Sequence, residues 1–109
     1  MFNVDAKPTF IRTVTVKVPN GEGHSEQTFK AEFQALDNDE VAKFNFNVAT
    51  ETTAFLENVI LSFDDVSGSD DKPIAYSIEL RDRVLKKQWA RLGLLRAYYA
   101  GVAAAAEGN

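Results

Sequence analysis

The chain has no cysteine among its 109 residues and a single histidine, His24. The absence of thiols excludes disulfides, thiolate nucleophiles and cysteine-ligated zinc, and it fits a reducing cytoplasm. A single imidazole, with no second histidine and no cysteine, provides too few of the usual ligands for a transition-metal site. Because His24 lies between Gly23 and Ser25 in a predicted turn, we expect it to be a solvated turn residue. The composition thus predicts no metal and no cofactor.

Long hydrophobic runs and catalytic motifs are missing as well. The longest apolar run is far shorter than the ~20 residues that cross a bilayer, and no signal-peptide core is recognisable, so we expect no membrane partner. Phosphate-binding loops, dinucleotide fingerprints and nucleophile elbows are absent. A chain this short also has little volume for a substrate cleft. We therefore expect no catalytic residues and no enzymatic activity.

Basic residues are in deficit, with 12 Lys and Arg against 16 Asp and Glu, a formal net charge of −4. This balance argues against a nucleic-acid partner, which needs clustered basic side chains. Between Asp37 and Asp71 there are nine acidic residues and one basic residue, whereas Lys72 to Asn109 carries seven basic and three acidic ones. Two interpretations stay open: two solvated faces that differ in sign, or complementary patches for head-to-tail self-association or partner docking.

The segment after residue 63 concentrates acidic side chains around a Ser-Gly-Ser sequence. An EF-hand-type calcium loop needs glycine at its sixth position and glutamate at its twelfth. Counted from Asp65, glycine is fourth and the twelfth residue is Tyr76, so this motif does not match. The favoured role is to keep an exposed loop soluble, with a weak nonspecific cation site as the alternative. The four carboxylates are Asp64, Asp65, Asp70 and Asp71.

Two alternating runs around an Asn-Gly turn predict an antiparallel β-hairpin over about 9–36. Its apolar face would carry Val14, Val16, Phe29 and Phe33. Because an isolated hairpin is marginally stable, this face must be covered by the chain's own helices or by a neighbouring subunit. Both edges of a two-stranded sheet could also recruit a strand from another copy. Residues 1–8 show no periodicity and are expected to be flexible.

The remainder predicts helices, which gives an α+β fold: a hairpin followed by a bundle of three to five helices over about 37–106, in a single domain over 9–109. Asp37 and Glu40 have capping-box spacing and predict a short helix that extends to Val48. Thr50 or Thr52 would cap a helix over 51–63. Pro73 interrupts the helical pattern, and Ser77 would cap the next helix. Whether one helix or two follow up to residue 106 is left open.

The final helix carries an aromatic and basic set with two interpretations. Such residues usually belong to the core, and adjacent tyrosines point about 100° apart, so both cannot be central to one interface. Trp, Tyr and Arg also dominate binding hot spots. We expect Trp89→Ala to unfold the domain, and changes at Arg96 or Tyr99 to weaken partner binding with the fold intact. The candidate partner-binding residues are Trp89, Arg91, Arg96, Tyr98 and Tyr99.

Several of these motifs together resemble the tail assembly chaperones of long-tailed bacteriophages. The resemblance covers most of the chain. Its shared features are a strand of the form F-x-A-x-F, a helix motif F-L-x-x-V-I, an acidic loop, a proline, a serine cap and a final A-Y helix that ends in small residues. The matching positions are Phe29, Ala31, Phe33, Phe55, Leu56, Val59, Ile60, Phe63, Asp65, Val66, Pro73, Ser77, Ala97 and Tyr98. Phe63 stands where many relatives carry Trp, and 86–88 lacks a proline that is common before the last helix.

This resemblance implies a non-catalytic helper of tail morphogenesis. Such a protein would bind and solubilise the tape measure protein, help to recruit subunits of the major tail tube protein, and act in the cytoplasm of the bacterial host without entering the mature virion. The alternative is a structural tail component, such as a connector or tube-associated protein, that is retained in the particle. A generic binding module unrelated to phage is a third possibility. Self-association is compatible with each of these.

Overall fold

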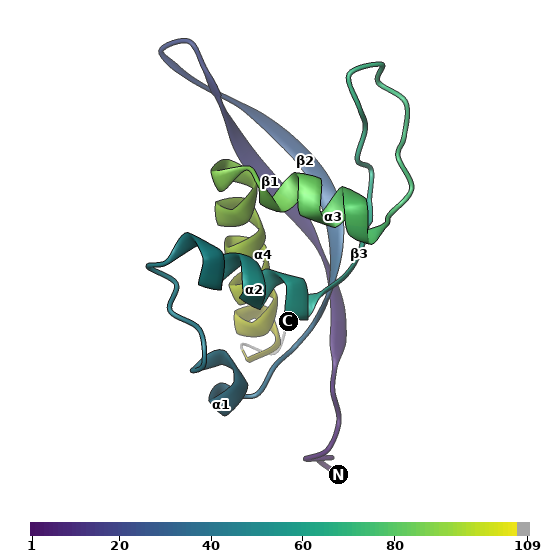
Figure 1. Ribbon diagram of the computed structural model, residues 1–109. Helices are drawn as coiled ribbons and strands as arrows, with labels where there is room; N and C mark the ends of the chain where they lie inside the picture. The colour runs from purple at the N-terminus through teal and green to yellow at the C-terminus, as the bar shows by residue number, and fades with distance from the viewer. Residues whose placement is uncertain (107–109) are drawn as a thin grey trace.

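The computed structural model describes residues 1–106, which form a three-stranded antiparallel sheet and four helices (Figure 1). The predicted α+β fold, an N-terminal hairpin followed by helices, is confirmed. The sheet order is β1-β2-β3. The strands are β1 (Thr9–Asn20), β2 (Gly23–Gln34) and β3 (Ile60–Asp64), and the helices are α1 (Asn38–Val41), α2 (Ala49–Val59), α3 (Ile78–Leu85) and α4 (Gln88–Ala106).

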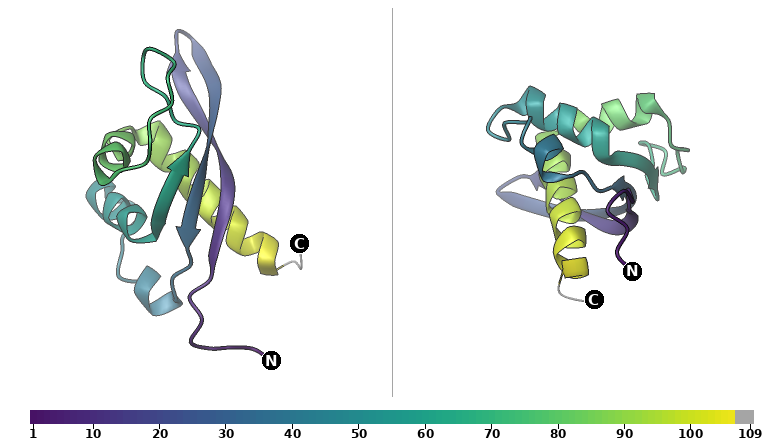
Figure 2. Two further views of the ribbon diagram at one scale, coloured as in Figure 1. Left: turned by 90° about the vertical axis from the view of Figure 1, so that its right-hand side faces the viewer. Right: turned by 90° about the horizontal axis from the view of Figure 1, so that it is seen from below.

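The hairpin pairs β1 and β2 in continuous register from Thr9 opposite Gln34 to Asn20 opposite Gly23. The two-residue turn contains Gly21, whose φ of 56° suits a residue without a side chain. Alternate residues face the helices, and Val14 and Phe33 are fully buried on that face. The left view of Figure 2 shows α2 and α3 on one face of the sheet. The chain's own helices therefore cover the apolar face of the hairpin.

The prediction of a helix over 51–63 is wrong at the C-terminal end of that range. Helix α2 stops at Val59, and Ile60–Asp64 pairs as β3 with the Lys30–Phe33 part of β2. The segment has apolar side chains, and its backbone pairs with a β2 edge that would otherwise lack hydrogen-bond partners. This tertiary pairing overrides the helical spacing of the apolar residues. Ile60 and Phe63 are buried on the inner face, while Leu61 is exposed. The sheet therefore has three strands, one more than the hairpin predicted from the sequence.

Two helix starts also differ from the expectation. Asp37 precedes α1, but its side chain makes no capping hydrogen bond and α1 spans only four residues. The predicted helix does not extend to Val48, which is instead the N-cap residue of α2. Neither of the two threonines predicted as caps occupies that position. The Asn45 side chain instead accepts a hydrogen bond from the Asn47 amide at 3.0 Å, a local turn that competes with helix. The predicted cap at Ser77 is confirmed, since its Oγ accepts from the Leu80 amide at 3.0 Å.

The C-terminal region contains two helices, which answers the question left open by the sequence. Helix α3 ends at Leu85, and α4 begins at Gln88 after a short connection. The α4 face that enters the core is made of Ala90, Leu94, Ala97 and Tyr98. Leu92 and Tyr99 lie outside this face and are exposed, and the small residues of the face let α4 approach β1 closely. Gly93 lies against the Thr15 carbonyl, and Gly101 lies against the Phe10 ring.

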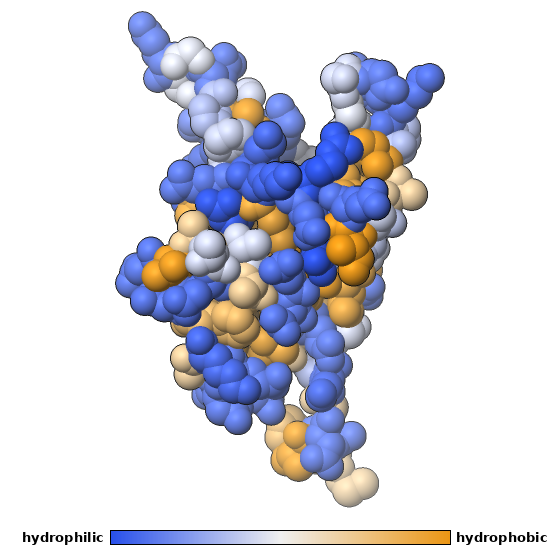
Figure 3. Space-filling view, viewed as in Figure 1, coloured by the Kyte–Doolittle hydropathy of each residue, from blue (hydrophilic) through white to orange (hydrophobic). Residues whose placement is uncertain are grey.

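The molecule is elongated, with principal extents of 48 × 28 × 27 Å. The hairpin tip and the 65–77 loop project at one end as two arms, and the N-terminus lies at the other end (Figure 1). Figure 3 shows a notch between these arms, with apolar surface near its base. Within residues 1–106, no helix has the length and apolar character needed to cross a membrane.

Candidate functional site

The structure separates the five candidate partner-binding residues into different environments. Tyr98 is 2% exposed and therefore cannot contact a partner without unfolding. Its ring lies within 6 Å of the rings of Phe10, Phe33 and Phe55, and its hydroxyl accepts a hydrogen bond from the Leu36 amide at 3.0 Å. Tyr98 thus joins both hairpin strands, α2 and α4, and its assignment to a binding surface is corrected to a role in the core.

Arg91 has a structural contact of its own. Its guanidinium donates a hydrogen bond from Nη1 to the Leu85 carbonyl oxygen at 2.7 Å. Leu85 is the last residue of α3, where carbonyl groups lack partners within the helix and the helix dipole favours a positive charge. Arg91 therefore fixes the angle between α3 and α4, and the structure gives it a role in the fold.

Arg96 and Tyr99 are exposed on the side of α4 that faces away from the core. Leu92, Tyr99 and Val102 are 45%, 45% and 42% exposed, and Leu95 between them is half-buried. Their spacing of three and four residues places them along one line of the helix. We call the residues Leu92, Leu95, Tyr99 and Val102, with Arg96 beside them, the α4 stripe.

An aromatic contact extends the α4 stripe toward α2. The Phe46 ring lies 6.4 Å from the Tyr99 ring in an edge-on arrangement, and Phe46 is itself 36% exposed. Burial raises the pKa of the Tyr99 phenol above its ordinary value, and Tyr98 beside it raises the pKa further, so Tyr99 is neutral at physiological pH. The stripe therefore offers an apolar and aromatic line bordered by one guanidinium.

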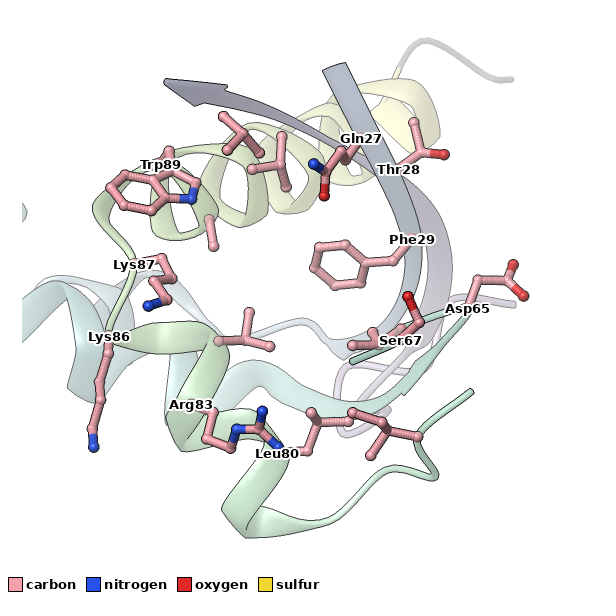
Figure 4. A pocket seen from close by; sticks show the side chains of 16 residues that line it. Gln27, Thr28, Phe29, Asp65, Ser67, Leu80, Arg83, Lys86, Lys87 and Trp89 are labelled. Carbon is pink, nitrogen blue, oxygen red and sulfur yellow. The ribbon is translucent and has the colours of Figure 1, made fainter. Parts of the chain in front are cut away.

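Trp89 belongs to a second surface, which we call the arm groove. This cavity of about 460 Å³ lies among the hairpin, the 65–77 loop and the α3–α4 corner. In Figure 4, Phe29 extends from β2 into the cavity and Trp89 lines the opposite wall. The rim carries Arg83, Lys86 and Lys87 on the helical side and Asp65 on the loop side. The apolar side chains of the lining include Val16, Val18, Phe29, Val66, Ile74 and Trp89.

The structure changes the expectation for Trp89→Ala. Trp89 is half-buried at the start of α4 and packs against the edge of the core, so its truncation removes only part of an indole from the protein interior. We expect a loss of about 1–2 kcal/mol in unfolding free energy, with a cooperative transition retained. Chemical denaturation followed by far-UV circular dichroism measures this. An unfolded variant would show that Trp89 contributes as much as a fully buried core residue.

The carboxylates of the acidic loop do not converge. Asp65 and Asp71 adopt left-handed backbone conformations with φ of 63° and 60°, and the Asp70 side chain accepts a hydrogen bond from the Lys72 amide at 3.1 Å. Among residues 1–106, no three His, Cys, Asp or Glu side chains come together in a way that could hold a metal ion. His24 is exposed near the hairpin tip, as expected for a solvated turn residue.

Sequence reasoning missed the arm groove as a site, although it selected Trp89. The groove is assembled from three segments that are distant in the sequence, and its basic rim comes from the α3–α4 connection. The excess of basic residues after Lys72 was the available signal. Comparison with known proteins finds no matching family model, no matching curated protein and no matching solved structure.

Proposed function

We propose that this protein is a tail assembly chaperone of a long-tailed bacteriophage. In this role it binds the tape measure protein in the host cytoplasm, keeps it soluble, helps to recruit tail tube subunits, and leaves before the virion is complete. The proposal rests on the sequence resemblance and on one structural observation, the α4 stripe. A tape measure protein is long, largely helical and prone to aggregate, so its chaperone needs a surface that accepts an apolar helix face.

The α4 stripe has the properties that such a partner requires. Its apolar residues recur at three- and four-residue spacing, which lets two helices pack side by side. Tyr99 supplies a rigid aromatic anchor, and Phe46 widens the contact area on one side. Arg96 at the border can pair with acidic residues beside the partner's apolar face. Partial exposure of each residue favours a contact of moderate strength, which suits a chaperone that must release its client.

The proposal predicts a specific effect of the double substitution Leu92→Ser and Tyr99→Ser. Both side chains are about half exposed, so the fold is retained, while the apolar contact is lost. We expect affinity for the tape measure protein to fall roughly thirtyfold, equivalent to about 2 kcal/mol. Co-expression with a tape measure protein should then yield several times less soluble partner than the wild-type chain does.

Ile11→Ser is the matched control, because Ile11 is 65% exposed on the uncovered face of the sheet and lies outside the α4 stripe. This variant should preserve the soluble yield. If the wild-type chain does not raise the partner's soluble yield, the chaperone proposal fails. Mass spectrometry of purified virions tests the structural alternative, since near-stoichiometric copies in the particle would identify a retained tail component.

A further inference from the structure

The N-terminal half of β2, residues 23–29, has a free edge. Strand β2 runs over Gly23–Gln34, but β3 pairs only with its Lys30–Phe33 part. At Asp65 the chain leaves the sheet with a φ of 63°. Residues 23–29 of β2 therefore pair with β1 on one side and with no strand on the other, within the part of the chain that the structure describes.

The hairpin register identifies the backbone groups on this edge. Asn20 and Gly23 close a two-residue turn, so they form a hydrogen-bonded pair, and such pairs alternate along antiparallel strands. Thr15 and Thr28 are then a non-hydrogen-bonded pair, whose backbone groups point outward. The position of the Thr15 carbonyl against Gly93 of α4 agrees with this. The amide and carbonyl of Thr28, and those of Glu26, thus face the free edge.

This edge borders the arm groove, in which Gln27, Thr28 and Phe29 are lining residues. An extended segment beside β2 would direct alternate side chains into the apolar cavity and would satisfy the free backbone groups, which is the usual mode of strand addition. The cations Arg83 and Lys87 on the rim favour a segment that carries negative charge. The expected occupant is therefore extended, with apolar side chains at alternate positions and a carboxylate where it passes the rim.

The segment that precedes β1 has apolar side chains at alternate positions. In the free molecule residues 3–6 form a turn, closed by a hydrogen bond of 3.3 Å from the Ala6 amide to the Asn3 carbonyl oxygen, so strand addition requires this turn to open. The side-chain charges of Asp5 and Lys7 balance each other. Phe2 and Val4 are 89% and 75% exposed, and they alternate with Asn3 and Asp5. Phe2 and Val4 are among the most exposed large apolar side chains in residues 1–106. In Figure 3 the lower end of the molecule, where the N-terminus lies in Figure 1, shows apolar surface. This segment gains apolar burial only if another surface covers it.

The groove of the same molecule is out of reach. Thr9 and Val16 lie seven residues apart along β1, about 23 Å. Residues 1–8 span about 26 Å when fully extended, so folding back to the level of Val16 would use almost their entire length and leave none to pair. Insertion therefore requires the groove of a second molecule.

We propose that residues 1–7 of one copy add as a strand to the free edge of β2 in a second copy, with Phe2 and Val4 in the arm groove. Each copy is then a donor at one end and an acceptor at the other. The contact is heterologous, so repetition gives a ring or an open filament. Asp5 provides the carboxylate that faces the basic rim of the acceptor.

Sedimentation velocity of the purified wild-type chain over a concentration series tests the proposal. The expected result is concentration-dependent association, which the double variant Phe2→Ser/Val4→Ser weakens at least thirtyfold. Trp89 is the only tryptophan and lines the groove, so its fluorescence reports occupancy. A synthetic peptide of residues 1–8 should shift the emission of this double variant, and a peptide carrying the same two serines should not.

A mixing experiment distinguishes this contact from a symmetric one. Thr28→Pro removes an outward-facing amide and should abolish acceptor function without breaking the pairing to β1. The exposed pair Arg83→Glu/Lys87→Glu serves the same purpose without any backbone change. A donor-deficient and an acceptor-deficient variant, each monomeric alone, should form a one-to-one dimer when mixed.

A wild-type chain that is monomeric at all concentrations would overturn the proposal. Association that is unchanged by Phe2→Ser/Val4→Ser, or the absence of the mixed dimer, would overturn it equally. Ile11→Ser is again the control and should associate like wild type. These measurements use no tape measure protein, and co-expression with the Leu92 and Tyr99 variants tests the chaperone function separately. Failure of one proposal therefore does not resemble failure of the other.

Discussion

Tyr98→Ala is expected to lower the unfolding free energy by about 3–5 kcal/mol, as for other buried aromatic truncations. The side chain is 2% exposed, and its ring contacts the rings of Phe10, Phe33 and Phe55. Its removal leaves a cavity where four elements meet. The Leu36 amide also loses its hydrogen-bond acceptor, the Tyr98 hydroxyl. A domain of this size has only about 5–15 kcal/mol of total stability. The variant should therefore melt roughly 15 °C or more below the wild-type chain.

Thermal denaturation monitored by circular dichroism measures this loss. Tyr98→Phe keeps the ring and removes only the hydroxyl, so it should cost about 1–2 kcal/mol. Tyr99→Ala is the matched control, because the neighbouring tyrosine on the same helix is 45% exposed and should cost less than about 1 kcal/mol. Equal losses for the Tyr98 and Tyr99 alanine variants would contradict the placement of Tyr98 at the centre of the core.

The neighbouring tyrosines also illustrate what the sequence could predict. Their 100° separation on a helix required that at most one be central to an interface, and the structure buries Tyr98 and exposes Tyr99. The choice between them depends on which α4 face meets the sheet. Hydrophobicity alone does not decide this, because large apolar residues lie on both faces of the helix. The buried face combines Leu94 and Tyr98 with small residues at 90, 93 and 97, which let α4 approach β1.

The hairpin could be predicted because strand alternation and turn chemistry are local properties. Strand β3 could not be predicted in this way. Residues 55–61, FLENVIL, have helical spacing, and the strand that pairs with β3 is β2, some thirty residues away in the sequence. The same reason explains the arm groove: its walls come from three distant segments, and no local pattern records their meeting. The function expected from the sequence is likewise a proposal about contacts with another chain, for which the α4 stripe supplies the surface.

The two proposed contacts lie on different parts of the molecule and are compatible with each other. The head-to-tail contact uses the N-terminal segment and the arm groove, whereas client binding uses the outward face of α4. A row of associated copies would then present the α4 stripe repeatedly along one direction. A long helical client needs such repeated coverage, and many moderate contacts in series give high avidity with rapid local release. Self-association would in this way increase the length of client that is kept from aggregating.

Close contact between α4 and β1 leads to the second prediction, on Gly93→Val. A β-carbon at Gly93 would lie 2.6 Å from the Thr15 carbonyl oxygen and 3.3 Å from Cγ1 of Val14. The first of these atoms belongs to the backbone of a paired strand, which cannot rotate away as a side chain could. We expect a loss of about 3 kcal/mol from displacement of α4, at the upper end of typical overpacking effects.

The smaller change Gly93→Ala tests the same contact through the sign of the change in unfolding free energy. In a helix interior without close neighbours, replacement of glycine by alanine stabilises by about 1 kcal/mol through helix propensity. At Gly93 the clash with Thr15 should reverse that gain and lower the unfolding free energy. Ala103→Val, on an exposed position of the same helix, controls for the intrinsic cost of valine and should change stability by less than about 1 kcal/mol. A stabilised Gly93→Ala variant would mean that α4 can move away from β1 at little cost, and the edge of β1 would then be open to other strands.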